Sequence, residues 1–197
     1  MIAGVVLAAG RSSRMGSPKA LLELSGRSFL DRIVAAFREG GCDPVIVVSG
    51  PDTLPGATEV RERALAAGAR IAMNPDPGSE QIESLRVALR SLTGPVDGAI
   101  VSPVDSPRVD AATVAALIAA AHGGAPVAVP TVEGRRGHPI LFGAAVLPEL
   151  FEPLPEGART ILRRHEERLV EVPVENRDVL LDIDTPEQYR RLKEAER

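Results

Sequence analysis

Residues 2–19 read Ile2-Ala3-Gly4-Val5-Val6-Leu7-Ala8-Ala9-Gly10-Arg11-Ser12-Ser13-Arg14-Met15-Gly16-Ser17-Pro18-Lys19. The first six residues form a short apolar run, which is typical of a buried β-strand. Small residues follow, and the segment 1–22 carries three cations and no acid. Small residues let backbone N–H groups approach an anion, and Arg and Lys add charge-assisted hydrogen bonds to phosphate. The stretch predicts a strand that ends in a phosphate-binding loop, and the alternative is a solvated basic turn.

Two common phosphate-binding motifs do not fit this loop. A P-loop needs four residues between its glycines and then Lys-Ser/Thr, whereas five residues separate Gly10 from Gly16, and Ser17-Pro18 follows. A dinucleotide fingerprint needs Gly-x-Gly-x-x-Gly, but Ala8 and Ser12 stand where glycines on either side of Gly10 are required. The sequence therefore argues against a P-loop enzyme and against a dinucleotide-dependent redox enzyme.

Outward from this loop, apolar runs alternate with amphipathic segments. We expect strands at 45–48, 69–73, 99–104 and 127–129, and helices at 29–37, 59–67, 79–92 and 111–121. Residues 131–141 suit a hairpin that turns near Gly134, and Thr185-Pro186 suits the N-cap and first position of a last helix. Strands separated by helices imply βαβ units. The predicted fold is α/β: one three-layer, Rossmann-like domain over residues 1–197, with a mostly parallel sheet and a small β-hairpin excursion in the C-terminal third.

Composition excludes several classes of function. The net charge of −4 and the 3% of aromatic residues are unlike those of a protein that binds nucleic acid over a broad face. The single cysteine, Cys42, forms no internal disulfide. The N-terminus lacks the features of a signal peptide, and no apolar run approaches the ~20 residues of a membrane helix. We expect a cytoplasmic protein with no membrane or nucleic-acid partner.

Two acidic segments are candidates for a metal site. The strand at 99–104 delivers Asp105 to the sheet edge that the first loop leaves, and Mg²⁺ prefers one or two carboxylates with phosphate oxygens and water. The alternative for Asp105 is a residue that begins a turn before Pro107. In Leu181-Asp182-Ile183-Asp184-Thr185-Pro186, Asp184 or Thr185 caps the last helix, or Asp184 binds the metal and Thr185 is the cap. Strand alternation then turns Asp182 to the other face, in a structural role.

The pattern Leu-Ala-Ala-Gly-x-Ser-x-Arg-Met-Gly-x-Pro-Lys at 7–19 resembles the signature of the nucleotidyltransferases that include the molybdenum cofactor guanylyl- and cytidylyltransferases. Related loops occur in sugar-phosphate and methylerythritol-phosphate nucleotidyltransferases. The Gly137-His138-Pro139 segment and the Asp-Ile-Asp-Thr-Pro string at 182–186 resemble the cytidylyltransferase branch, and the resemblance extends from Val5 to Leu192. Guanylyltransferases tend to have a second glycine at the place of Ala9, which favours the cytidylyl branch.

This resemblance implies transfer of CMP from CTP, with Mg²⁺, to the terminal phosphate of molybdenum-loaded molybdopterin. Pyrophosphate is released, and an apo-molybdoenzyme receives the product. The implied roles are nucleotide binding, catalysis, metal binding by Asp105 and Asp184, and acceptor binding by His138 and Arg136. The implied nucleotide-binding residues are Leu7, Ala8, Ala9, Gly10, Arg11, Ser12, Gly16 and Ser84, and the implied catalytic residues are Arg14, Lys19 and Asp105.

Several alternatives stay open at this point. Where the family has glycines before its Ser-Leu helix start, this chain has Gln81-Ile82-Glu83, and Ser79 is then only a helix N-cap. His138 either contacts the acceptor or makes a structural hydrogen bond, and Arg136 either meets an anion or solvates the hairpin. The alternative functions are transfer from GTP, transfer to a sugar phosphate or another small phosphate, and a non-catalytic carrier of the finished pterin cofactor.

Overall fold

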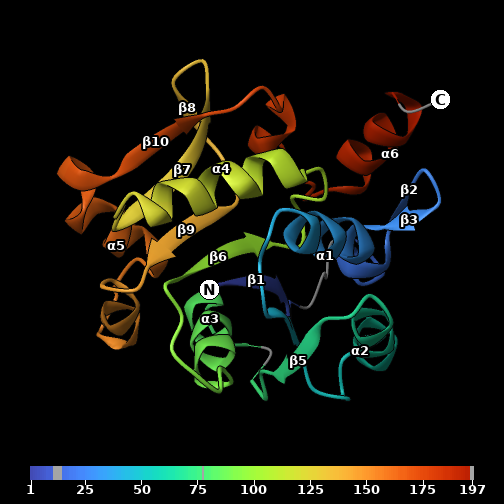
Figure 1. Cartoon of the computed structure of the whole chain (residues 1–197). Coiled ribbons are helices and arrows are strands. Elements are labelled where there is room, and N and C mark those ends of the chain that lie inside the picture. Colours follow the sequence, from blue (N-terminus) through green and yellow to red (C-terminus); the bar gives the residue numbers. More distant parts are fainter. Residues whose placement is uncertain (11–14, 77, 196–197) are drawn as a thin grey trace.

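The computed structural model describes residues 1–10, 15–76 and 78–195. Its central sheet has the strand order β10-β7-β9-β6-β1-β4-β5, and β8 pairs with β7 (Figure 1). The strands of this sheet are β1 (Ile2–Ala8), β4 (Val45–Ser49), β5 (Arg70–Met73), β6 (Gly98–Pro103), β7 (Val127–Val132), β8 (Arg135–Arg136), β9 (Ile140–Gly143) and β10 (Val170–Pro173). The short strands β2 (Glu23–Leu24) and β3 (Arg27–Ser28) form a separate hairpin.

Strand β1 lies between two parallel neighbours, since Val5 is paired with Ile46 of β4 on one side and with Val101 of β6 on the other. The chain runs from β1 through β4 to β5 and then returns to β6 across β1. Such a reversal opens a crevice at the carboxyl ends of the strands. The mostly parallel α/β sheet is confirmed, and the exceptions are β8 and β9, which run antiparallel to their partners.

The helices follow the predicted segments closely. They are α1 (Phe29–Glu39), α2 (Ala57–Ala66), α3 (Gln81–Arg90), α4 (Ala111–His122), α5 (Ala158–Arg164) and α6 (Pro186–Ala195), with the 3₁₀ turns η1 (Lys19–Leu21), η2 (Leu147–Phe151), η3 (Glu166–Arg168) and η4 (Arg177–Leu180). The expectation that Ser79 caps α3 is wrong. The N-cap is Glu80, and the Ser79 hydroxyl donates instead to the Asp76 carbonyl.

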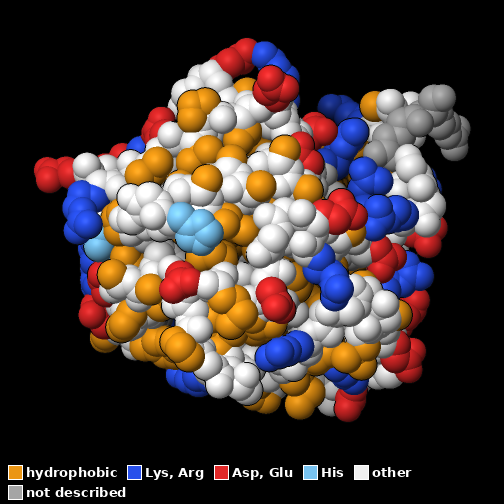
Figure 2. Space-filling model, in the orientation of Figure 1, with side chains coloured by type: hydrophobic (Ala, Val, Ile, Leu, Met, Phe, Trp, Pro, Cys, Tyr) orange, Lys and Arg blue, Asp and Glu red, His pale blue; other side chains and the backbone are white. Residues whose placement is uncertain are grey.

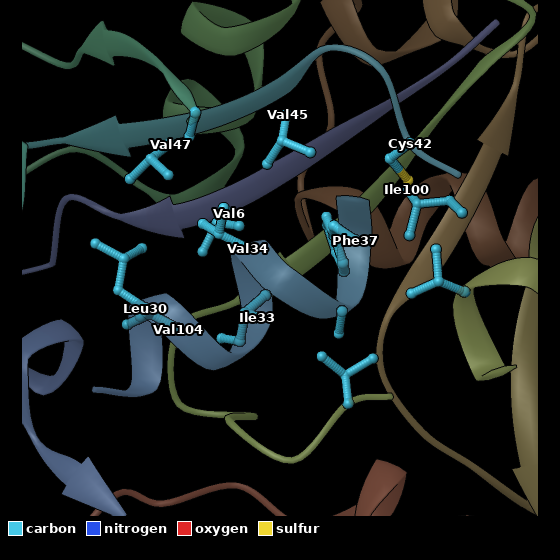
Figure 3. Packing of buried hydrophobic residues seen from close by; sticks show 14 of the residues in the cluster. Val6, Leu30, Ile33, Val34, Phe37, Cys42, Val45, Val47, Ile100 and Val104 are labelled. Atoms are coloured by element: carbon cyan, nitrogen blue, oxygen red, sulfur yellow. The ribbon is translucent and has the colours of Figure 1, made fainter. Parts of the chain in front are cut away.

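Alternate residues of each central strand enter different cores. Val45 and Val47 pack beneath helix α1, whereas Ile46 and Val48 enter the core beneath α3. Figure 3 shows the first core, in which Leu30 and Phe37 of α1 gather over the strands. Helices α1 and α4 contact each other over this face (Figure 1). The two-residue period of a strand thus produces the predicted three layers.

The surface in Figure 2 has basic and acidic side chains interspersed over the visible face. Within the described ranges, no helix combines the length and the hydropathy that a membrane span requires.

Replacing Leu30 with Ala tests the core beneath α1. Leu30 is completely buried, so the substitution leaves a cavity, and we expect the free energy of unfolding to fall by about 2–5 kcal/mol. The control is Leu65→Ala on α2, where the side chain is 60% exposed and the expected change is within about 0.5 kcal/mol. Urea denaturation of both variants measures the difference, and equal losses would contradict the described core.

Candidate functional site

The carboxyl ends of β1 and β6 open into a cavity of about 390 Å³, here called the loop cavity. Four consecutive predicted nucleotide-binding residues line it, namely Leu7, Ala8, Ala9 and Gly10, and Ser84 lines its opposite wall. A Cβ added at Gly10 would meet no atom of the described residues within 4 Å. The cavity therefore presents main-chain groups to a ligand at the predicted place.

The remaining loop residues are placed less directly. Gly16 lines a neighbouring cavity of about 220 Å³ that also contacts Ala8 and Gly10. Its φ of +69° is a left-handed conformation that glycine adopts without strain. The predicted ligands Arg11 and Ser12 and the predicted catalytic Arg14 lie outside the described residues.

Three charged side chains meet in the wall of the loop cavity. The ammonium Nζ of Lys19 donates to Asp105 Oδ2 at 3.1 Å and to Asp184 Oδ1 at 2.7 Å. The side chains of Lys19 and Asp105 are 13% and 24% exposed, whereas that of Asp184 is 51% exposed. The structure thus brings together the predicted lysine and both predicted metal-binding carboxylates, with the cation between the two acids.

Backbone and side-chain hydrogen bonds hold the two acidic segments together. The N–H of Ile183 donates to the carbonyl of Asp105 at 2.8 Å, and the buried Ser106 hydroxyl donates to Asp182 at 2.8 Å. The completely buried Ile183 anchors this segment in the core. These hydrogen bonds hold the segment of Asp105 beside the segment of Asp184, so the two carboxylates lie close together.

Helix α6 is fixed to the segment that carries Lys19. The Thr185 hydroxyl accepts from the N–H of Gln188, as expected for an N-cap. The phenol of Tyr189 donates to the Glu23 carbonyl at 2.8 Å and accepts from the Glu23 N–H. These contacts join the start of α6, next to Asp184, to β2, which follows η1.

Electrostatics keep Lys19 charged. Burial acts to lower the pKa of Lys19, but the hydrogen bonds and negative charges of Asp184 and Asp105 outweigh it and hold the pKa above its usual value. The chemistry of the donor set also suits a divalent ion, since two carboxylates already surround a positive charge and hard cations such as Mg²⁺ prefer oxygen ligands.

A polar network around the predicted Ser84 borders the same cavity and includes residues to which the sequence analysis gave no part in the site. The amide of Asn74 donates to the hydroxyls of Ser84 and Ser79 at 2.9 and 3.0 Å, and its Oδ1 accepts from the N–H of Asp76. Asn74, Asp76 and Ser79 line the loop cavity with Ser84. The signal for this group was the polar Asn-Pro-Asp string directly after β5.

A second cavity of about 710 Å³, here called the hairpin cavity, adjoins the first. Leu7, Gln81 and Pro103 line both cavities. The walls of the hairpin cavity are largely aliphatic. Its charged and titratable lining includes His138, Arg136, Arg159 and Asp182. Asp182 lines the hairpin cavity and Asp184 the loop cavity, although residues 181–184 form no strand.

His138 sits in the wall of this second cavity. The backbone N–H of His138 donates to the Val179 carbonyl at 2.8 Å. The ring Nδ1 is buried and has no hydrogen-bond partner among the described residues. Burial lowers the pKa of His138; Asp182 and Asp105 oppose that shift, and the positive charge of Arg159 adds to it. The ring is therefore neutral near pH 7 and presents an unused polar atom.

The two arginines of the hairpin cavity differ in their partners. Arg136 pairs with both oxygens of Glu166 and with Glu171, and these acids raise its pKa. Arg159, at the start of α5, makes no ion pair or hydrogen bond with any described residue. No sequence motif singled out Arg159, because only the folding of α5 over the cavity brings it to the site.

Replacing His138 with Asn tests whether the buried imidazole ring is neutral in the folded protein. Burial lowers the folded-state pKa below the unfolded value of about 6.5. The neutral ring therefore stabilises the fold fully above about pH 6.5, and this contribution is lost as the pH falls below that value toward the folded pKa. We expect Tm to fall more steeply between about pH 7.5 and 5.5 in the wild type than in His138→Asn. Parallel Tm curves in calorimetry would contradict this assignment.

Comparisons with known proteins find similarity over most of the chain. A model described as MobA-like NTP transferase domain matches residues 4–169. The nicotine blue oxidoreductase of Paenarthrobacter nicotinovorans is 30% identical over 97% of this chain and 96% of its own length. The molybdenum cofactor guanylyltransferase of Rhizobium meliloti is 29% identical over 94% of this chain and 88% of its own.

Solved structures show the same architecture. Rv0371c from Mycobacterium tuberculosis H37Rv has a TM-score of 0.84 and 31% identity, with 98% of each chain covered. A complex of Rv0371c with manganese has a TM-score of 0.79 and 29% identity, again with 98% of each chain covered. The match at 4–169 includes the first loop, the Asp105 strand and the hairpin cavity strands. This chain belongs to the family of the MobA-like NTP transferase domain.

Proposed function

We propose that this protein transfers CMP from CTP to the terminal phosphate of molybdenum-loaded molybdopterin and releases pyrophosphate. The observation that carries the proposal is the meeting of Lys19, Asp105 and Asp184 at the edge of a cavity whose floor is a loop of small residues. The guanylyltransferase relative supports the transfer of a nucleotide to a molybdenum cofactor.

The choice of CTP rests on Ala9. Its methyl group is buried in the lining of the loop cavity, at a place where the sequence resemblance predicts glycine in enzymes that use GTP. A methyl group there narrows the space for a base and favours a pyrimidine, an effect of about 1–3 kcal/mol.

The chemistry proposed is in-line displacement at the α-phosphorus by the acceptor phosphate. No protein nucleophile is needed, so catalysis depends on positioning and on charge stabilisation. The backbone from Leu7 to Gly10 and at Gly16, with Arg11 and Ser12, holds the triphosphate, and Ser84 contacts the nucleotide. Arg14 and Lys19 neutralise the charge that develops on the leaving pyrophosphate.

Asp105 and Asp184 would hold Mg²⁺. When bound, this ion supplies positive charge to the phosphate oxygens. The neighbouring carboxylates of Asp105 and Asp184 fit such an ion, and the manganese complex of Rv0371c supports the use of a divalent metal.

The hairpin cavity is the proposed acceptor site. It shares the wall formed by Leu7, Gln81 and Pro103 with the loop cavity, so an acceptor there lies next to the nucleotide. His138 and Arg136 are the acceptor-binding residues that the sequence resemblance implies, and Arg159, which has no ion-pair partner among the described residues, is a further candidate. The proposed recipient of the product is an apo-molybdoenzyme.

A turnover screen tests the reaction itself. CTP and GTP are compared with Mg²⁺, with molybdenum-loaded molybdopterin or a sugar phosphate as acceptor, and pyrophosphate release is measured. Release only with GTP, or only with a sugar phosphate, would overturn the proposed substrates. Binding of the pterin with no binding of metal and nucleotide indicates a carrier, and a redox reaction without pyrophosphate release indicates an oxidoreductase, the activity named for one relative.

Substituting Lys19 or Asp105 with Ala removes part of the charged cluster. Because these groups act on the transferring phosphates, we expect each variant to lose about 10²–10³-fold or more in kcat while it stays folded. Lys193→Ala, on the exposed face of α6, is the control and retains wild-type turnover. Wild-type activity of Lys19→Ala or Asp105→Ala would refute the assigned roles.

Arg159→Gln and Arg136→Gln compare two arginines of one cavity. Arg159 has no partner to lose within the described part of the chain, whereas Arg136 is held by Glu166 and Glu171. We expect Arg159→Gln to raise KM for the pterin acceptor by about tenfold, the loss of one charge-assisted contact, and Arg136→Gln to raise it by less. KM for CTP stays unchanged in both. The opposite ranking would identify Arg136 as the anion-binding residue.

A further inference from the structure

The ammonium of Lys19 occupies the space between the two carboxylates assigned to the metal. Its Nζ contacts Asp105 Oδ2 at 3.1 Å and Asp184 Oδ1 at 2.7 Å. Mg²⁺ binds oxygen at about 2.0–2.1 Å and demands a near-ideal octahedral arrangement. An ammonium between the same two oxygens leaves no room for such an ion. Lysine and metal therefore exclude each other at this point.

We propose that Lys19 is the resident counter-ion of the Asp105–Asp184 pair, and that a divalent metal enters only when a triphosphate draws the ammonium away. This inference rests on the proposed function, because it takes both carboxylates as metal ligands. It adds that metal and nucleotide bind cooperatively and that the lysine exchanges one set of anionic partners for another.

Repulsion between the carboxylates of Asp105 and Asp184 explains why a cation lies between them. The backbone link from Ile183 to Asp105 fixes the acidic segments side by side, so two carboxylates face one point in a partly buried wall. Like charges at such a place repel and are poorly screened. Lys19 offsets this repulsion in the nucleotide-free protein, and a metal arriving alone has to break both ion pairs.

The fold also places Lys19 within reach of the phosphates that would become its new partners. Lys19 lines the loop cavity together with Leu7, Ala8 and Gly10, and a lysine ammonium on its flexible stem reaches several positions from one backbone site. Phosphates bound to that loop offer new anionic partners within the same cavity. By linkage, if the nucleotide strengthens metal binding, the metal strengthens nucleotide binding by the same factor.

Metal titration without nucleotide is the first test. Mn²⁺ binding is followed by electron paramagnetic resonance of the free ion in wild type, Lys19→Met, Lys19→Arg and Lys193→Met. We expect Lys19→Met to bind Mn²⁺ alone about tenfold or more tightly than wild type, a factor within the usual range of couplings. Lys19→Arg keeps the charge and Lys193→Met leaves the cluster intact, so both stay close to wild type.

Nuclear magnetic resonance of the wild type is the second test and needs no variant. The chain has two lysines, Lys19 and Lys193, so lysine labelled with ¹³C at Cε gives two assignable signals. We expect the Lys19 signal to move on addition of Mg²⁺ with CTP, and to move far less with Mg²⁺ alone at the same concentration. The Lys193 signal, from a residue over the ring of Tyr189, serves as the internal reference.

The outcomes separate the inference from the proposed function. If Lys19→Met binds Mn²⁺ alone no more tightly than wild type, or if Mg²⁺ alone moves the Lys19 signal fully, Lys19 is not the counter-ion. If wild type binds neither Mn²⁺ nor Mg²⁺ even with CTP, the proposed metal–nucleotide site fails instead.

Discussion

The pairing of β1 with a parallel strand on each side is the constraint on which the site depends. Because β4 and β6 lie on opposite sides of β1, the chain leaves β1 toward β4 and leaves β6 toward β7 in the opposite direction, and the carboxyl ends of β1 and β6 face a crevice. The loop after β1 and the turn after β6 therefore line one cavity, although long segments separate them in sequence. The charged side chains of Lys19, Asp105 and Asp184 line the cavity at this edge of the sheet.

The third part of the site comes from the end of the chain and is held by local bonds. Ile183 donates its N–H to the carbonyl of Asp105, and Tyr189 ties α6 to Glu23. These links bring Asp184 to Lys19, and the ion pairs between Lys19 and both acids then offset part of the negative charge of the two carboxylates. The contacts that hold the end of the chain at the sheet edge and the proposed chemistry thus use the same three side chains.

The two adjoining cavities differ in the chemistry of their walls. The loop cavity is bordered by main-chain groups and by the Asn74–Ser84 network, which suits a nucleotide. The hairpin cavity is mostly aliphatic, with polar groups at His138 and a few charged positions. Family membership alone does not choose the acceptor, because relatives include a guanylyltransferase and an oxidoreductase of similar length. Function has to be argued from the side chains of the site, because one fold can carry several chemistries.

The sequence by itself determined the α/β class, because strand and helix periods are local properties of the chain. It also identified the first loop, Asp105, Asp184 and the cap at Thr185, since their motifs are contiguous. It did not identify the antiparallel β9, the N-cap of α3 at Glu80 instead of Ser79, or the position of Arg159 in the wall of the hairpin cavity. Only the tertiary structure decided these features and the position of the Lys19 ammonium between two acids, because contacts between distant segments depend on how helices and strands pack and not on any local pattern.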